Sequence, residues 1–168
     1  MSDKSDLLLL LLYLSGKVRG KTRLFKMVYI AQEELKRTVA RARTTTVPLD
    51  YYVFYAHHYG AYSKEMESDL HELENQGFAE RELSTSSSFE VNTYSLTPRG
   101  IRKVRDSRLP KEAIAAVGYV VGKYRDIPLT WLLREVYNKY PGFLGSEPSD
   151  RNPQDLVPAG ARACACSV

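Results

Sequence analysis

Six consecutive leucines, Leu7 to Leu12, constrain the fold of this chain more than any other feature. A helix that is apolar on every side is stable in water only when other elements cover it all round. The run is far too short to cross a bilayer, which takes about 20 apolar residues. We therefore expect a short helix that begins at Asp6, runs through Leu14 and lies buried in the core, and we expect no membrane association.

The rest of the chain is expected to cover this helix with further helices and one β-hairpin. The second helix should begin near Thr22 and end before a solvated loop that holds Arg37, Arg41 and Arg43. Other helices are expected over 63–77, where Ser63 is the N-cap, and over 97–108, 112–124 and 129–140. A short strand is expected over 51–55, a turn over 59–61, and a β-hairpin over 78–96. The fold class is mainly α with a small hairpin, or α+β.

The 168 residues and 19.1 kDa fit one main domain with a real core. We expect that domain to span 1–108, with helices over 109–144 that pack on it or form a dimer. A disordered tail is expected over 145–168, where periodicity gives way to Ser, Pro, Asp and Ala. Cys164 and Cys166, the two cysteines, lie in that tail, so the body lacks disulfides and suits the cytoplasm.

Charge is distributed in three blocks along the chain. Residues 17–43 carry nine basic and two acidic groups, and residues 99–111 carry six basic and one acidic group. Between them, residues 63–90 carry eight acidic and two basic groups. Basic blocks permit contact with nucleic acid, whereas the acidic block opposes it.

Three segments carry a resemblance to a known fold family. They are Ser63 to Gly77, Phe78-Ala79-Glu80-Arg81, and Tyr94-Ser95-Leu96-Thr97-Pro98-Arg99-Gly100. Their succession of helix, strand, hairpin and capped helix resembles the winged helix-turn-helix of DNA-binding regulators. The resemblance implies a winged helix with two extra C-terminal helices.

A second resemblance brings in the two ends of the chain. Gly20 to Tyr29, His58 to Ser63, and Leu132 to Tyr137 followed by Tyr140-Pro141 are similar to patterns of archaeal uncharacterised winged-helix proteins and, more distantly, of the SocA-type antitoxin (Panacea) domain. That second group includes antitoxins and proteolytic adaptors as well as suspected DNA-binding proteins. It implies the fold more than any one activity.

A winged helix usually places its third helix in the major groove of DNA. In this chain the helix over 63–77 is acidic, and we expect its outer face to present Lys64, Glu67, Ser68, His71, Glu74 and Asn75. Such a face would repel phosphate, so we expect double-stranded DNA to be bound by two basic clusters instead. The first cluster, at the start of the second helix, is Lys17, Arg19, Lys21 and Arg23. The second is Arg99, Arg102, Lys103 and Arg105. Solvated faces without a partner are the alternative for both clusters.

The alternative function is a protein-interaction module of the antitoxin or adaptor kind. Its acidic helix would meet a basic partner through Lys64, Glu67, His71 and Glu74. Trp131, which lies off the apolar stripe of the last helix beside Arg134, would either anchor an interface or pack on the core. The helices over 112–124 and 129–140 carry more apolar surface than a winged domain needs, which favours a homodimer.

No enzyme is expected. The segment Gly16 to Thr22 resembles a phosphate-binding loop, but it has three residues between its glycines where that loop has four. No His, Cys and carboxylate pattern shows the spacing of a metal site, so we expect neither metal nor cofactor.

Overall fold

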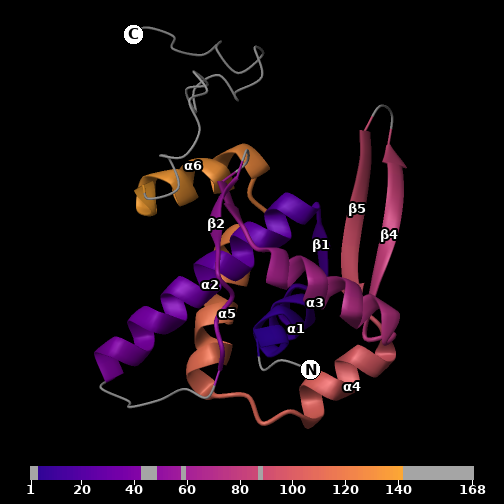
Figure 1. Ribbon diagram of the computed structural model, residues 1–168, viewed down its shortest axis with the longest axis horizontal. Coiled ribbons are helices and arrows are strands. Elements are labelled where there is room, and N and C mark those ends of the chain that lie inside the picture. The colour runs from indigo at the N-terminus through magenta and orange to yellow at the C-terminus, as the bar shows by residue number, and fades with distance from the viewer. Residues whose placement is uncertain (1–3, 43–48, 58–59, 87–88, 142–168) are drawn as a thin grey trace, which may run out of the picture.

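The computed structural model describes residues 4–42, 49–57, 60–86 and 89–141 (Figure 1). In chain order the elements are α1 (Lys4–Ser15), β1 (Lys17–Arg19), α2 (Lys21–Ala42), β2 (Tyr55–His57), β3 (Gly60–Tyr62), α3 (Lys64–Asn75), β4 (Ala79–Ser86), β5 (Phe89–Leu96), α4 (Pro98–Asp106), α5 (Lys111–Tyr124) and α6 (Leu129–Lys139). The fold is mainly helical with small antiparallel sheets, which confirms the expected α+β class. In the described part of the chain, no helix combines the length and the apolar character that a bilayer crossing requires. The expected tail over 145–168, with Cys164 and Cys166, lies outside the described residues.

Helix α1 lies at the centre of the fold, as the leucine run predicts (Figure 1). Leu7 to Leu12 are each between 0 and 3% exposed. Their neighbours come from α2, α3, α4 and α5 and from strands β1 and β5. Burial of an isobutyl group stabilises a fold by about 2 kcal/mol, so these leucines supply a large part of the driving force for folding.

The predicted hairpin is present, but it belongs to a three-stranded sheet in the order β1-β5-β4. Strand β1 pairs with β5, with Lys17 opposite Ser95 and Arg19 opposite Thr93. The prediction that Lys17 and Arg19 lie at the start of the second helix is therefore wrong. Gly16 and Gly20 flank the strand at φ 72° and 94°, a conformation that glycine adopts without strain. These glycines make the two turns that insert β1 between α1 and α2.

Helix α2 is longer than predicted. It begins at Lys21, close to the expected Thr22, but continues through Arg37 and Arg41 to Ala42, where a loop was expected. Glu33 pairs with Lys36, and Glu34 with Arg37, at the i,i+3 spacing that stabilises a helix surface. These pairs support the segment that the prediction assigned to a solvated loop.

The strand predicted over 51–55 is also wrong in position. Tyr52 bonds to the side chain of Gln32 through both its backbone N–H (2.8 Å) and its carbonyl (2.9 Å), so the segment is held by α2 and pairs with no strand. The strand begins at Tyr55 and pairs with β3, which occupies part of the predicted turn over 59–61. Tyr59 itself lies outside the described residues.

Helices α5 and α6 have the predicted bounds to within one residue. Helix α5 packs against α1 and α2, and α6 packs against α2. At the end of α6 the ring of Tyr140 meets Tyr29 edge to face at 5.1 Å. Both helices therefore contribute side chains to the same core as α1.

Candidate nucleic-acid interface

Helix α3 is fixed at both ends by the residues that the sequence nominated. The hydroxyl of Ser63 accepts a hydrogen bond from the N–H of Met66 at 3.3 Å, which confirms Ser63 as the N-cap. Met66, Leu70 and Leu73 are buried, as predicted. Gly77 ends the helix at φ 70°. Because the ends and the buried side of α3 are fixed, the helical period determines which residues lie on its other sides.

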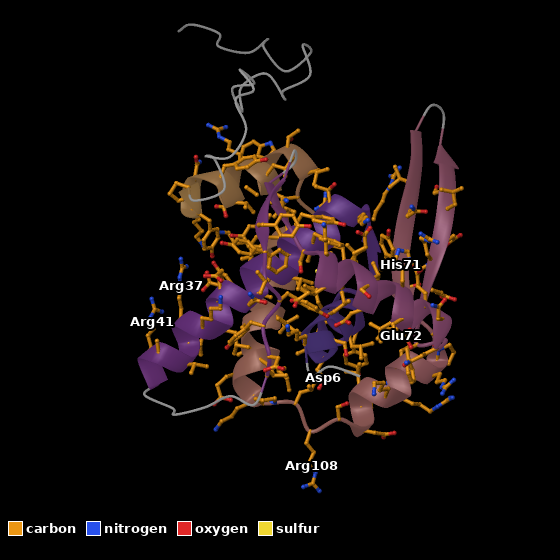
Figure 2. All side chains as sticks on the ribbon, viewed as in Figure 1. Asp6, Arg37, Arg41, His71, Glu72 and Arg108 are labelled. Carbon is orange, nitrogen blue, oxygen red and sulfur yellow. The ribbon has the colours of Figure 1, made fainter. Side chains whose placement is uncertain are left out.

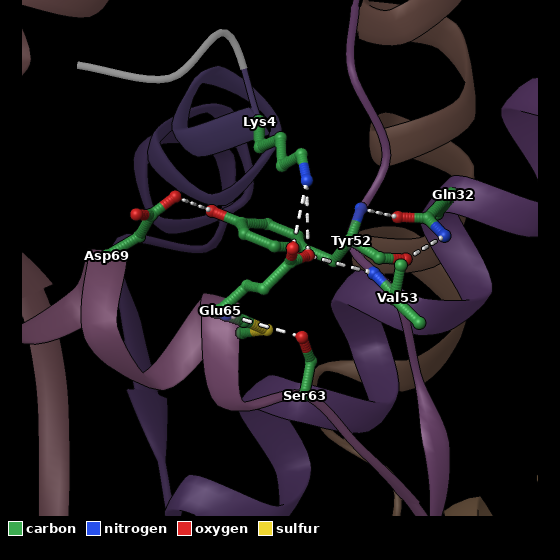
Figure 3. A network of polar contacts seen from close by, with 8 residues as sticks. Lys4, Gln32, Tyr52, Val53, Ser63, Glu65 and Asp69 are labelled. Carbon is green, nitrogen blue, oxygen red and sulfur yellow. Dashed lines mark hydrogen bonds and ion pairs between the residues drawn. The ribbon is translucent and has the colours of Figure 1, made fainter.

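The carboxylates of α3 are largely paired within the fold. Lys4 of α1 contacts both oxygens of Glu65 at 3.1 and 3.2 Å, and the hydroxyl of Tyr52 donates to Asp69 at 2.9 Å (Figure 3). The N–H of Val53 also donates to Glu65, at 3.2 Å. These contacts lower the pKa of Glu65, with the bond from Val53 as the largest cause. Glu65 and Asp69 of the acidic block therefore hold α1 and the segment before β2 against α3.

Glu67 and Glu74 do not lie on the outer face of α3, where they were expected. Only 29% of the Glu67 side chain and 16% of the Glu74 side chain are exposed. Glu67 pairs with Lys21 and accepts from the hydroxyl of Tyr62, whereas Glu74 lies 3.7 Å from Arg81 of β4. Both residues sit about 90° around the helix from the centre of the buried stripe, so they are flanking residues. A helical wheel centred on Met66, Leu70 and Leu73 was the signal that could have shown this.

The face of α3 that points to solvent is polar and nearly neutral. Its exposed residues are Lys64, Glu65, Ser68, His71, Glu72 and Asn75, and Glu65 among them is paired with Lys4. Glu72 accepts a bond from its neighbour Gln76 at 2.6 Å. His71 also lies on this side of α3 (Figure 2), with Nδ1 3.5 Å from Glu74. Amide, hydroxyl and imidazole groups of this kind can form hydrogen bonds with base edges.

The first predicted basic cluster is dispersed by the structure. Lys21 pairs with Glu67 and lies over the rings of Phe25 and Tyr62. Arg23 donates from Nη1 to the carbonyls of Tyr124 and Arg125, at 2.9 and 3.2 Å, so it caps the end of α5. Burial lowers the pKa of Arg23. Neither side chain is free to bind phosphate.

Lys17 and Arg19 remain exposed on β1, but they face away from α3. Directly paired residues in an antiparallel sheet point to the same side. Val18, Tyr94 and Arg81 are in register, and Arg81 contacts Glu74 of α3. Lys17 and Arg19 therefore lie on the opposite face, where Lys17 approaches Glu82 at 3.6 Å.

The second predicted basic cluster lies beside the end of α3. Thr97 caps α4 as predicted, by accepting from the N–H of Gly100 at 3.1 Å. Arg99 donates to the carbonyl of Gln76 at 3.0 Å and lies 4.7 Å from the ring centre of Phe78, and Lys103 covers the same ring at 5.2 Å. Arg102 is exposed, and Arg105 turns toward α1, 3.4 Å from the hydroxyl of Tyr13. Arg99 and Lys103 thus lie where α3 ends, and Arg102 is exposed on the same helix as they are.

Trp131 and Arg134 lie on the exposed side of α6. The Trp131 side chain is among the most exposed large apolar groups described, at 63%, so it does not pack on the core. Both residues lie on a different helix from the proposed α3 surface and are far from it in the sequence.

Two further features of the sequence analysis concern a metal site and a phosphate-binding loop. The described residues contain no group of three His, Cys, Asp or Glu side chains placed to hold a metal ion. The segment that resembled a phosphate-binding loop is built as strand β1 between two glycine turns. No family model, no curated protein and no solved structure matches the chain.

Proposed function

We propose that the chain is a winged-helix protein that binds double-stranded DNA as a homodimeric transcriptional regulator. The hairpin β4-β5 is the wing, and α3 beside it is the helix that enters the major groove. The observation that carries the proposal is the pairing of the α3 carboxylates inside the fold. Ion pairs of Glu65, Glu67 and Glu74 with Lys4, Lys21 and Arg81 reduce the repulsion that the sequence suggested between this helix and phosphate.

Phosphate contacts come from the cluster at the end of α3. Arg99 and Lys103 supply two positive charges at the end of α3, and the exposed Arg102 adds a third on the same helix α4. Basic groups that flank a polar helix face fix its register on the duplex, while the helix reads base edges. This assignment keeps one of the two clusters predicted from the sequence and removes Lys21 and Arg23 from the interface.

Binding of a fluorescein-labelled duplex, measured by anisotropy at constant salt, tests this assignment. Replacement of Arg99 and Arg102 by alanine should weaken binding about tenfold or more, because two phosphate contacts are lost. Arg37→Ala with Arg41→Ala is the matched control, since these two arginines project from the far end of α2 (Figure 2). Equal affinity of both double variants would contradict the assignment, provided that urea unfolding shows both to be folded.

Base reading by α3 has its own test. His71→Ala and Asn75→Ala should reduce discrimination between a selected duplex and a random one, with smaller effects on binding to the random duplex. A uniform loss on both duplexes would assign these residues to phosphate contact and not to base reading.

A protein-interaction module is the second candidate, and the exposure of Trp131 beside Arg134 favours it. Trp131 is the sole tryptophan, so its fluorescence reports this surface alone. Addition of duplex should leave the emission unchanged if DNA binds at α3. A blue shift on addition of a co-purifying protein, together with loss of that co-purification in Trp131→Ala, would support the second candidate.

A further inference from the structure

Helix α5 is apolar on all sides, yet the described part of the chain covers only one of them. Residues 113–122 contain no charged side chain. The side packed on α1 and α2 buries Ala113, Ala116, Val117, Val120, Val121 and Tyr124. The opposite side exposes Ile114, Ala115, Gly118, Tyr119 and Gly122. A surface helix normally carries polar residues on its outer side, so this face is typical of a helix with a partner.

Gly118 and Gly122 lie on this exposed face, and no contact among the described residues requires a glycine at either position. A methyl group added at either position would meet no atom within 4 Å, and neither has a positive φ. Glycine is among the poorest helix formers, so its use twice within one helix weakens α5 unless something approaches the backbone closely. Tyr119 and Ile114 flank these small residues and protrude, with 49% and 44% of their surface exposed. The face therefore combines a row of small residues with two projecting side chains.

We propose that a second copy of this chain docks on the exposed face of α5, antiparallel and about a two-fold axis between Gly118 and Tyr119. The ring of Tyr119 then covers the partner's Gly118, and Ala115 lies opposite the partner's Gly122. Each copy supplies both the projecting ring and the small residues that the ring covers, as a two-fold interface requires. The inference rests on the homodimer in the proposed function and assigns its contact surface.

The charges at the two ends of α5 favour this occupant and this direction. In the antiparallel register Lys111 lies opposite the partner's Asp126, and Glu112 lies opposite the partner's Arg125. A parallel pair would bring like charges together at both ends. Asp126 is available for the contact, since 80% of its side chain is exposed and its described ion pair is with adjacent Arg125. Opposite charges across an interface select the partner and the register.

The size of the contact sets the expected strength. A helix of 14 residues is about 21 Å long. One pair of such helices buries less than a standard interface, so the dimer should be reversible with a dissociation constant in the micromolar range.

Sedimentation equilibrium of the whole protein, without DNA, tests the dimer. The mass should rise from 19.1 kDa toward twice that value across the micromolar range. Gly118→Glu should stay monomeric throughout, and it should remain folded because the space outside Gly118 is open. Asn138→Glu, at an exposed site on α6, is the matched control and should dimerise normally. A monomeric wild type, or a Gly118→Glu variant that dimerises like wild type, would overturn the proposal.

A charge exchange tests the antiparallel direction. Lys111→Asp and Asp126→Lys should each weaken dimerisation about tenfold, because each creates two like-charge contacts across the axis. The double variant should restore most of the loss. Failure of the double variant to recover would contradict the pairing of Lys111 with the partner's Asp126.

The dimer and the DNA interface can fail separately. Dimerisation is measured in the absence of nucleic acid, and Gly118→Glu leaves α3 and α4 unchanged. A wild type that dimerises but binds no duplex contradicts the DNA binding in the proposed function alone. A wild type that binds duplex as a dimer, with Gly118→Glu equally dimeric, contradicts the α5 interface alone.

Discussion

Lys26 is a buried lysine without a described carboxylate partner. It is 2% exposed, and its amine donates to the carbonyl of Ala61 at 2.7 Å. Burial lowers the pKa of Lys26 from 10.5 to about 7. The bond ties α2 to strand β3, directly before the N-cap of α3. The charge state of the Lys26 amine therefore affects the contact that holds β3, and the start of α3 after it, against α2.

This amine gives a pH dependence of stability with a definite sign. Between pH 7 and 10.5 the unfolded chain binds a proton at Lys26 that the folded protein does not bind. The free energy of unfolding should therefore rise with pH in this window and fall as pH falls. Relative to Lys26→Met, wild type should gain on the order of 2–3 kcal/mol between pH 7 and pH 10, measured by urea unfolding. A difference between the two proteins that stays constant with pH would contradict the assignment.

Gly100 is required by a close approach of two backbone segments. A methyl group at this position would overlap the carbonyl oxygen of Phe78, which also accepts from the N–H of Thr97 at 3.0 Å. Gly100→Ala should destabilise the fold by about 1–3 kcal/mol, as an overpacked site does. Gly118→Ala is the control and should stabilise the monomer by about 0.5–1 kcal/mol at dilute concentration, because its surroundings are open. Thermal unfolding of both variants decides the comparison.

Residue-level prediction succeeded where the reason is local. Ser63 and Thr97 were identified as helix caps because a hydroxyl before an apolar pattern satisfies free backbone N–H groups. The partners of Glu65 and Asp69 come from segments more than ten residues away, and no local pattern indicates them. For Glu67 and Glu74 the helical period held enough information to place them as flanking residues.

At the scale of elements, the end of α5 depends on a side chain from α2. Arg23 satisfies two terminal carbonyls of α5, which would otherwise lack partners. Arg23→Ala should therefore lower the free energy of unfolding by about 1–3 kcal/mol. Arg19→Ala, at an exposed position, should change it by about 0.5 kcal/mol or less. If Arg23→Ala instead weakened duplex binding with no loss of stability, the structural role assigned here would be contradicted.

Helices were predictable and short strands were not. The stripes of α2, α3 and α6 repeat over several turns, which gives a strong periodic signal. Strand β1 has three residues, of which only Val18 is apolar, and its pairing partner β5 is more than 70 residues away. The segment before β2 has the composition of a strand, but the amide of Gln32 takes its backbone bonds. In both cases tertiary contacts decided the structure.

At the scale of the whole molecule, one apolar helix organises the fold. Leu7 to Leu12 required cover on all sides, and the helices and the sheet around α1 provide it. The expected class followed from this run together with the order of the later patterns. The sequence shows how charge is distributed along the chain, but tertiary contacts decide which of these charges face solvent. Glu67 and Glu74, which were expected on the outer face of α3, became partners of Lys21 and Arg81. Glu65 and Asp69 of the same helix became partners of Lys4 and Tyr52.

Salt dependence of duplex binding by the wild-type protein tests the central claim most directly. If Lys64 on α3 and the cluster of Arg99, Arg102 and Lys103 contact phosphates, each contact releases a counterion. The logarithm of the association constant should then fall with the logarithm of salt concentration with a slope of about −3 or steeper. Binding that is absent at low salt, or that does not change with salt, would contradict the claim that this chain binds DNA through α3 and the basic end of α4.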